Sequence, residues 1–504
     1  MDSNEVKEIL NVVDGNSSPL NNDVNEVAII LAAGHGKRIK SQKSKMLHKI
    51  WGVPTVERVY YACRNSLKKM NIIVVVGIKA KDVVQVLGKR ESTAFAYQKE
   101  QNGTGHAVQV ALEKVDRKKF DGTVYVLPGD MGLIDAPTIK KFREDFKKSG
   151  SDMMVLTGIF EGKTKDNAYG RIIRVKEFDD SGSLSGNDSG RVIEIMENKD
   201  IQSLADDKPY KVKYNGRTYS YSKQELVGNK EFNSGVYAFK YKKLAELVHS
   251  ISSDNVQNEI YITDLIALFN KNGYSVTAVS PKDQDVLMGF NNKSVLLEME
   301  GVARKKAYDR LKDIIAIDDP DDFFIDDSVG DEIIEMDRRN IPLDISIGKG
   351  VHIGKGVKLN YNLDLEKNVF VDGNVKFGED VIIRQNVYLS CFPGQTLEIG
   401  NRVEILSGDI IKGNIVISDG TRIESSVNMT GSDEFPLRIG SNVLIKGTSY
   451  IFGSFIEDDV YIEHSVIIKK QVDKIFKRDG SIQPVRFYLP MPEGIDAIEE
   501  LKEK

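Results

Sequence analysis

The sequence predicts an α/β domain with a mainly parallel sheet, followed by a parallel β-helix. Two observations predict this fold: short apolar runs alternate with helical patterns up to about residue 290, and apolar residues then recur at every sixth position. Alternating strands and helices are typical of a parallel sheet covered by helices on both faces. A six-residue period is typical of a coil whose short strands each point one side chain inward.

Composition argues against several classes of protein. The 504 residues are 40% hydrophobic and 29% charged, which is enough to form large cores, and the net charge of −5 does not favour nucleic acid as a partner. Cys63 and Cys391 supply neither a disulfide framework nor a paired-cysteine metal site. The apolar run at residues 27–33 is too short to span a membrane, and no basic leader precedes it. We therefore expect a cytoplasmic protein that does not bind membranes.

The first domain is expected at residues 26–291, after a disordered tail at residues 1–25 that is polar and rich in turn formers. Its first strand is the apolar run at 27–31. Further strands and helices follow in alternation, with strands at 72–76, 124–127 and 153–157 and helices at 54–70, 104–114 and 136–148. In such sheets, ligands bind at the carboxyl ends of the parallel strands.

The second domain is predicted at residues 319–475, behind a linker helix at 292–318 whose apolar residues have helical spacing. Gly, Asn and Asp lie between its apolar positions and suit corners with left-handed backbone. A sandwich of short strands would show a period of two, with turns about every 8–12 residues. We expect the C-terminal extension at 476–504 to cover the open end of the coil.

The six-residue period is long and regular. It restarts after frame shifts at Ile399, Ile439 and Ile456 and ends at Ile468, and a second apolar residue often follows four positions later, as in Val351. Its first nine members are Ile341, Ile347, Ile353, Leu359, Leu365, Val371, Phe377, Ile383 and Leu389.

A glycine-containing loop follows the first strand and indicates an anionic ligand. Gly34 and Gly36 would let backbone amides approach phosphates closely. Arg38 and Lys45 would neutralise the negative charge of the phosphates. The loop lacks the third glycine of the dinucleotide fingerprint and the terminal Gly-Lys-Ser/Thr of a P-loop.

The segment LAAGHGKRIKSQKSKMLHKIWGVP resembles the signature of sugar-1-phosphate nucleotidyltransferases, and in detail the N-acetylglucosamine-1-phosphate uridyltransferase family. Bifunctional bacterial members of that family carry a left-handed β-helix behind the transferase domain. Seven further blocks follow in the family's order, at residues 98–107, 126–130, 168–172, 197–200, 231–235, 258–264 and 289–291.

The resemblance implies an activity: Mg²⁺-dependent transfer of UMP from UTP to N-acetylglucosamine 1-phosphate, which gives the cell-wall precursor UDP-N-acetylglucosamine and pyrophosphate. It assigns Mg²⁺ to Asp130 and Asn291. Asp130 also follows the apolar strand at 124–127, and a carboxylate at that edge suits a hard cation. The attacking sugar phosphate is already ionised, so the reaction needs positioning and charge neutralisation rather than a covalent nucleophile.

The resemblance also implies the other site residues. Arg38 and Lys45 would neutralise the triphosphate and the transition state. Three residues would hold the N-acetylhexosamine, namely Gly170, Glu197 and Asn233. Six would bind the nucleotide, with Gln98 and the backbone of Gly103 reading the uracil edge: Leu31, Ala32, Gly34, Gln98, Gly103 and Thr104.

The sequence departs from the family in three places. Met131 and Gly132 replace the usual pair after the aspartate, and the segment between Asp200 and Glu231 is longer than usual. The β-helix lacks the acetyltransferase segments of bifunctional members, and its histidines, His352 and His464, lie outside the family's context. Without a positioned base an amine attacks a thioester poorly, so we expect no acetyltransferase activity. The family also implies a homotrimer joined through the β-helix.

Two alternatives stay open at this point. A relative could use another pair of substrates, such as dTTP with glucose 1-phosphate, although those relatives favour a Gly-Gly-x-Gly-Thr-Arg loop. A chain of this organisation could also be a non-catalytic regulatory subunit, against which the joint presence of Arg38, Lys45, Asp130 and Asn291 argues.

Overall fold

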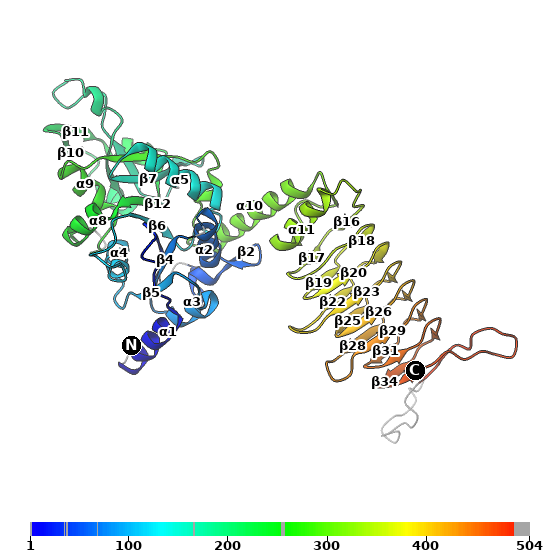
Figure 1. The fold of residues 1–504 in the computed structure, drawn as a ribbon. Coiled ribbons are helices and arrows are strands. Elements are labelled where there is room, and N and C mark those ends of the chain that lie inside the picture. The colour runs from blue at the N-terminus through cyan, green and yellow to red at the C-terminus, as the bar shows by residue number, and fades with distance from the viewer. Residues whose placement is uncertain are drawn as a thin grey trace, which may run out of the picture. The chain divides into compact units, whose positions relative to one another are not determined.

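The computed structural model describes residues 3–34, 36, 39–67, 69–164, 167–253 and 258–487. The chain divides into two compact units, Met1–Glu300 and Gly301–Lys504 (Figure 1). Within the described ranges, no helix is long and apolar enough to cross a membrane. The α-helices are α1 (Ser3–Asn16), α2 (Thr55–Ser66), α3 (Ala80–Leu87), α4 (Thr104–Leu112), α5 (Ala136–Ser149), α6 (Asn198–Ser203), α7 (Lys223–Gly228), α8 (Tyr241–Leu247), α9 (Asp264–Lys271), α10 (Lys293–Leu311) and α11 (Asp327–Asp337).

The first unit is built on a nine-stranded sheet. Its strands are β1 (Glu26–Ala32), β4 (Asn71–Val76), β5 (Thr93–Tyr97), β6 (Thr123–Pro128), β7 (Met153–Ile159), β8 (Arg171–Arg174), β9 (Val192–Met196), β12 (Glu231–Lys240) and β13 (Val276–Val279). The main path is β13-β7-β12-β6-β1-β4-β5, in which β1 runs parallel to β4 and β6, and β12 runs antiparallel to β6 and β7. The predicted mainly parallel α/β sheet is therefore confirmed.

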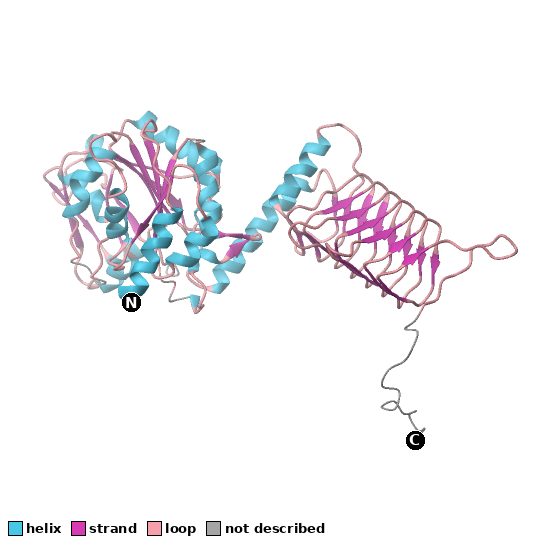
Figure 2. Cartoon of the chain, turned by 60° about the horizontal axis from the view of Figure 1, so that its bottom comes forward, coloured by secondary structure: helices cyan, strands magenta, loops and turns pink. Residues whose placement is uncertain are grey.

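Helices cover both faces of this sheet (Figure 2). The apolar sequence of β1 explains why, because successive side chains of a strand point to opposite faces. Ala28 and Ile30 join one buried cluster with α2, α3 and α5, whereas Val27 and Ile29 join a second cluster with α4, α8 and α9. A strand buried on both faces needs the continuous apolar run that the sequence shows here.

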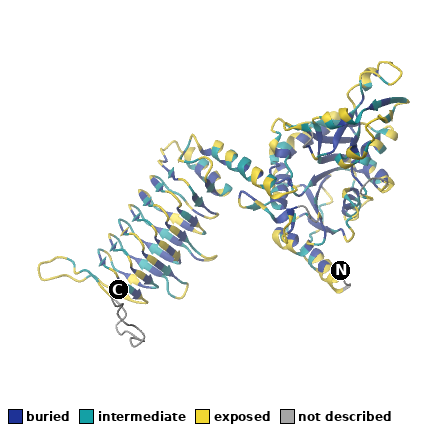
Figure 3. Cartoon of the chain, turned by 180° about the vertical axis from the view of Figure 1, so that it is seen from behind, coloured by how far each residue is buried: buried dark blue, intermediate teal, exposed yellow. Residues whose placement is uncertain are grey.

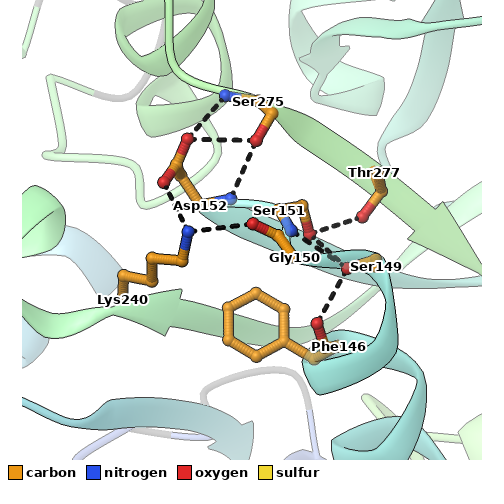
Figure 4. Close-up of polar contacts among 8 residues, drawn as sticks. All are labelled: Phe146, Ser149, Gly150, Ser151, Asp152, Lys240, Ser275 and Thr277. Atoms are coloured by element: carbon orange, nitrogen blue, oxygen red, sulfur yellow. Dashed lines mark hydrogen bonds and ion pairs between the residues drawn. The ribbon is translucent and has the colours of Figure 1, made fainter.

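The edge strand β13 is anchored to β7 by polar contacts (Figure 4). The Asp152 carboxylate accepts hydrogen bonds from the Ser275 N–H, at 2.9 Å, and the Ser275 hydroxyl, at 3.0 Å. Lys240, at the end of β12, donates to Asp152 at 3.0 Å and to the Gly150 carbonyl at 2.8 Å. This network lies where β7 and β13 begin, at the end of the sheet opposite their carboxyl ends.

The amino-terminal residues correct one prediction. A disordered tail was expected over residues 1–25, yet Ser3–Asn16 form α1, with Ile9 and Val13 each only 2% exposed. These two side chains are four residues apart, on one helix face, and they pack in the cluster that contains Phe95 of β5 and Val83 of α3. Their burial supplies the stabilisation that the polar composition did not suggest.

A small lobe follows β8 and contains the long segment between Asp200 and Glu231. It has its own buried cluster around Tyr219, and the segment folds into a hairpin of β10 (Tyr210–Tyr214) and β11 (Arg217–Tyr221) and then α7. A capping box of Ser222 and Glu225 begins α7.

The second unit is a left-handed parallel β-helix with three parallel sheets, as predicted (Figure 2). The first sheet contains β14 (Ala316–Ile317), β16 (Ser346–Ile347), β18 (Leu363–Leu365), β21 (Val381–Ile383), β24 (Glu404–Ile405), β27 (Arg422–Ile423), β30 (Leu444–Ile445) and β33 (Tyr461–Ile462). The second contains β15 (Phe323–Ile325), β17 (Val351–Ile353), β19 (Phe370–Asp372), β22 (Tyr388–Ser390), β25 (Ile410–Gly413), β28 (Asn428–Gly431), β31 (Tyr450–Phe452) and β34 (Val466–Ile468). The third contains β20 (Val375–Phe377), β23 (Leu397–Ile399), β26 (Ile415–Ile417), β29 (Leu437–Ile439), β32 (Phe455–Ile456) and β35 (Gln471–Val472).

The strands of the coils carry buried residues, coloured dark blue in Figure 3, and most of these residues are aliphatic. Leu365 and Ile383, which are register partners in neighbouring coils, are both fully buried. The period predicted three positions wrongly, because Ile341 is 51% exposed, Ile468 is 40% exposed and Leu359 is only partly buried. Ile341 precedes the regular coils. Ile468 faces outward, because the inward residue of the last coil is its neighbour Ile467, which is the register partner of Ile451 and is 1% exposed.

Aspartate interrupts one of the buried columns. Asp409 follows Val387 and precedes Val427 in successive coils, since the adjacent residues Tyr388, Ile410 and Asn428 are register partners. The Asp409 side chain is fully buried and accepts a hydrogen bond from the Val427 N–H at 2.7 Å. Its Oδ2 has no hydrogen-bond partner among the described residues, and burial raises its pKa to about 8.

The chain after the last coil pairs with that coil. Val485 donates to the Tyr461 carbonyl at 2.7 Å and accepts from Glu463, and the Phe487 carbonyl accepts from the Val466 N–H at 2.7 Å. These contacts lie in the predicted extension at 476–504, of which residues 488–504 fall outside the described ranges.

Candidate active site

The carboxyl ends of β1 and β6 form the base of the site. The Gly129 N–H donates to the Leu31 carbonyl at 2.9 Å, which fixes the end of β6 beside the end of β1. Asp130 comes directly after this contact, and Leu31 and the buried Ala32 lead into the glycine loop. The sheet therefore brings the metal-ligand candidate and the phosphate-loop candidate to one edge.

Lys45 joins the two predicted metal ligands. It begins a short 3₁₀ helix, Lys45–Leu47, whose Met46 and Leu47 are buried and so fix the direction of the lysine. Its ammonium forms an ion pair with the Asp130 carboxylate and donates to Asn291 Oδ1 at 3.0 Å. Two oxygens bonded to one nitrogen lie within about 6 Å of each other. The structure thus brings Lys45, Asp130 and Asn291 together, although the last two are far apart in sequence.

The glycine loop lies against Lys45. Gly36 has φ +61°, and a Cβ added to it would lie 2.8 Å from the Lys45 Cβ, so this position requires glycine. Gly34 is exposed, and an added Cβ would meet only the Met46 Cε, at 3.7 Å. Arg38, which the sequence assigned to the triphosphate, lies outside the described residues.

The loop after β5 carries the predicted base-reading residues. Gln98 is 3% exposed and its amide donates to the Gly103 carbonyl at 3.1 Å. Gly103 has φ +99°, and a Cβ there would lie 2.6 Å from the Ile260 carbonyl oxygen. Thr104 begins α4 and its hydroxyl accepts from the Ile262 N–H at 3.1 Å. Gln98 and Gly103 are therefore neighbours, and the hydroxyl of Thr104 helps to attach the loop to residues 260–262.

Gln101 connects this loop to the glycine loop. Its amide nitrogen donates to the carbonyl of Ala33, next to Gly34. No role was predicted for Gln101 from the sequence, and no simple signal in one sequence marks it. This hydrogen bond attaches the loop that follows β5, which contains Gln98, directly to the glycine loop that follows β1.

The sugar-side residues meet across three antiparallel strands. Arg171 in β8 pairs with Met196 in β9 and with Phe232 in β12. This register places Gly170 beside both other candidates: the Asn233 N–H donates to the Gly170 carbonyl at 2.9 Å, and a Cβ on Gly170 would lie 3.3 Å from Glu197 Oε1. Gly170, Glu197 and Asn233, which are distant in sequence, therefore form one cluster.

The Asn233 side chain takes part in local contacts within this cluster. Its amide donates to the Tyr237 hydroxyl at 2.7 Å, and its carbonyl accepts from the Gly235 N–H at 2.9 Å. Gly235 has φ +83°, at the irregularity where β12 shifts its register against β7.

Glu197 has an unusual electrostatic environment. Burial, together with the nearby carboxylates of Asp200, Asp264 and Glu259, raises the pKa of Glu197 to about 7. Burial and Asp200 also raise the pKa of Asp264 to about 6. Both groups therefore change charge close to neutral pH, and displaced pKa values are common where a protein binds or transforms a ligand.

Comparisons with known proteins match this organisation. The family model described as a MobA-like NTP transferase domain matches residues 28–165. A Bifunctional protein GlmU from Streptococcus agalactiae serotype III (strain NEM316) is 30% identical over 488 residues, which cover 89% of this chain and 96% of that protein. The chain belongs to the GlmU family.

Other GlmU relatives match over a shorter length. The Bifunctional protein GlmU of Caldanaerobacter subterraneus subsp. tengcongensis is 34% identical over 304 residues, which are 60% of this chain and 57% of that protein. That match spans less than two thirds of the relative's length. A crystal structure of UDP-glucose pyrophosphorylase complexed with UDP-glucose has 14% identity and a TM-score of 0.38, and covers 56% of this chain and 100% of that one.

The oxygen pair of this GlmU-family chain fits a hard divalent cation. Asp130 supplies carboxylate oxygens and Asn291 an amide oxygen, and Mg²⁺ usually takes one or two protein oxygens and completes its shell with phosphates and water. Both oxygens already bind one cationic group, the Lys45 ammonium. No group of three or more His, Cys, Asp or Glu side chains that could hold a metal occurs within the described ranges.

Two aromatic residues complete the site of this GlmU-family chain, and the sequence did not predict them. Phe290 is buried, and the Lys45 ammonium lies 5.3 Å from its ring centroid. Tyr169 stacks on Phe232 at 4.6 Å, and its hydroxyl donates to the Gly289 carbonyl at 3.3 Å. Tyr169 and Phe290 lie inside the family blocks at 168–172 and 289–291. These blocks marked the region, but roles were assigned only to the neighbouring Gly170 and Asn291.

Proposed function

We propose that the protein transfers UMP from UTP to N-acetylglucosamine 1-phosphate, giving UDP-N-acetylglucosamine and pyrophosphate. The observation that carries this proposal is the convergence of Lys45, Asp130 and Asn291 at the carboxyl edge of the sheet, beside a glycine loop. The reaction joins two anions, so its main requirement is positive charge at a fixed place. Membership of the GlmU family supports the choice of substrates.

Each group of site residues is assigned to one part of the substrates. The backbone of the loop that contains Gly34 binds the triphosphate, and Gln98 with Gly103 holds the base beside it. Gly170, Glu197 and Asn233 orient the sugar so that its phosphate oxygen faces the α-phosphorus. Lys45 stabilises the negative charge that develops on the phosphoryl oxygens during displacement of pyrophosphate. Asp130 and Asn291 would hold Mg²⁺, which when bound supplies further neutralisation of the phosphates.

One assay tests this function and separates its alternatives. The full chain is incubated with Mg²⁺, each nucleoside triphosphate in turn and a panel of sugar 1-phosphates, and pyrophosphate release is followed. Release with UTP and N-acetylglucosamine 1-phosphate supports the proposal. Faster pyrophosphate release with another pair would show that this other pair, and not the proposed one, is the preferred substrate pair. No release with any pair would contradict enzymatic function. Omission of divalent cation, with EDTA present, tests the requirement for metal.

We further propose that the β-helix has no acetyltransferase activity. Contacts of its two histidines support this. The His352 ring stacks between Phe324, at 4.5 Å, and Phe370, at 4.6 Å, and burial lowers its pKa. His464 shares its Nδ1 with the Thr448 hydroxyl, at 2.8 Å, and the Gly447 carbonyl. These contacts hold both rings against residues of their own and neighbouring coils. Acetyl-CoA and glucosamine 1-phosphate should give no release of free CoA thiol.

We also propose a cytoplasmic homotrimer joined through the β-helix. An outward-facing row of the second sheet supports this assembly: Tyr388, Ile410 and Tyr450 are each about 40% exposed although largely apolar, and only Asn428 interrupts them. A second and third copy of the chain would cover such a row. Light scattering on the purified protein should give three times the mass of one chain, and a monomer mass would contradict the trimer.

A further inference from the structure

The amino-terminal helix α1 lies along the edge strand of the sheet. Residues that follow the helix occupy the outer hydrogen-bonding groups of β5: the Phe95 N–H donates to the Ser17 hydroxyl at 2.9 Å, and the Ser18 N–H donates to the Thr93 carbonyl at 2.7 Å. The edge strand is thereby covered by the chain's own first residues.

Charged and apolar contacts attach the helix along its length. Ile9 and Val13 pack into the cluster of α3 and β5, and Glu8 forms an ion pair with Lys81 of α3. Asn21 and Asn71 exchange two hydrogen bonds of 2.8 and 2.9 Å at the start of β4. Through these apolar, ionic and hydrogen-bonding contacts, α1 and the residues that follow it belong to the first unit.

The helix is oriented toward the site. Its carboxyl end is beside Thr93, the first residue of β5. Its first turn is near Tyr97, the last residue of β5, because the Glu5 carboxylate acts with burial to raise the Tyr97 pKa. Tyr97 also packs against the cluster that holds Ile9 and Val13. α1 therefore runs antiparallel to β5, with its amino end at the edge of the sheet where Gln98 follows.

Gln98 and Gln101 depend on where β5 ends. Gln98 comes directly after Tyr97, and its N–H donates to the Val76 carbonyl of β4 at 2.8 Å. Gln101 binds the Ala33 carbonyl, three residues further along the same loop. A small displacement of β5 would thus move the base-reading residue and the glycine loop together, and small displacements of positioning groups cost large factors in binding or rate.

We propose that α1 is a positioning element for the nucleotide-binding loop, which sets the affinity for the nucleoside triphosphate by holding β5 and Gln98 in place. The inference rests on the proposed function, because it takes the loop after β5 as the nucleotide site. It assigns a role in substrate binding to a segment that contains none of the nucleotide-contacting residues.

The test compares the full chain with a variant that lacks residues 1–16. The KM for the triphosphate that the full chain uses best should rise about tenfold, the factor that corresponds to loss of one well-placed contact. The KM for the sugar 1-phosphate and kcat should change less than about twofold. An unchanged triphosphate KM in a folded truncated protein would overturn the inference, since a purely structural helix would lower Tm and leave this KM alone.

Point variants keep the test decisive if the truncated chain does not fold. Ser17→Ala removes the acceptor for the Phe95 N–H and should raise the triphosphate KM. Asn11→Ala is the matched control, because Asn11 is exposed on the same helix, and it should leave this KM unchanged. Equal effects of Ser17→Ala and Asn11→Ala would overturn the inference. If the full chain turns over no triphosphate, the proposed function fails instead, which is a separate result.

Discussion

Lys45 and Asp130 form an ion pair at the carboxyl edge of the central sheet, with both side chains less than a fifth exposed. The pairing is made by a lysine whose direction is fixed by buried neighbours and by an aspartate at the end of a buried strand. Asn291 completes the arrangement from a distant part of the chain. Partly buried charges act more strongly than exposed ones, so this pair is suited to both metal binding and transition-state stabilisation.

The first prediction concerns Asp130. Asp130→Asn keeps the size and removes the charge, so turnover should fall at least about 100-fold, as for loss of one strong electrostatic contributor. Binding of Mn²⁺ to the protein–UTP complex, measured by electron paramagnetic resonance, should weaken in parallel. Asp121→Asn is the control, since that exposed carboxylate precedes the other end of β6 and pairs with Lys242. Near-normal turnover of a folded Asp130→Asn protein would remove the metal assignment.

The two loop glycines should separate binding from catalysis. Gly34→Ala places a methyl group in ordinary contact with Met46 only, so the free energy of unfolding should stay unchanged. The same methyl group would stand between the loop amides and a phosphate, so the KM for UTP should rise about tenfold or more. Gly36→Ala forces its Cβ against Lys45 at a positive φ, so kcat should fall and Tm should drop. Identical kinetic profiles for the two variants would contradict these roles.

Glu197 should make sugar binding depend on pH. Its pKa of about 7 means that the carboxylate is protonated below this pH and ionised above it. An ionised carboxylate is the stronger acceptor for sugar hydroxyls, so the KM for the sugar 1-phosphate should fall as pH rises from 6 to 8. Glu197→Gln should raise that KM and remove this part of its pH dependence. The substrate phosphate titrates equally in assays of the wild type and of Glu197→Gln, so its contribution cancels when the two pH profiles are compared. Glu177 is exposed, and Glu177→Gln is the control. A pH profile that is the same in wild type and Glu197→Gln would count against the assignment.

Asp409 should make the stability of the β-helix fall with rising pH. Its pKa is about 8 in the folded chain against an ordinary value of 3.8, so the folded state holds a proton that the unfolded state releases. The associated stability is present in full below pH 4 and is lost as pH rises through about 8, by up to about 1.4 kcal/mol for each pH unit. Asp409→Asn removes this ionisation, so its Tm advantage over wild type should grow between pH 5 and pH 9. A constant difference would show that the carboxyl does not titrate in this way.

Much of the fold could be predicted because it depends on repeated local patterns. The period of six identified Leu365 and Ile383 as stacked interior residues, since an inward position in one coil implies one in the next. The same reasoning failed for Ile341, which precedes the regular coils, and for Ile468, because the inward residue of that coil is its neighbour Ile467. It also overlooked Asp409, which breaks a valine column and could have been found as a polar residue at an inward position.

The site could be predicted only where the family blocks supplied it. Residue chemistry alone singled out Asp130 and the cations of the glycine loop, whereas Asn291, Gly170 and Glu197 came from the resemblance. Their meeting depends on strand register, such as that of Arg171 with Met196 and Phe232, which one sequence does not reveal. The burial of α1 was missed for a similar reason, because the partner surface for Ile9 and Val13 is formed by residues far along the chain.

The pairing of Val485 and Phe487 with the last coil has a consequence for solubility. A stack of parallel strands ends in N–H and C=O groups that could add a strand from another molecule, and repeated addition would build a fibre. Here the chain folds back and satisfies the N–H groups of Glu463 and Val466 itself. Variants that weaken this return segment should therefore polymerise end to end before they lose their native secondary structure.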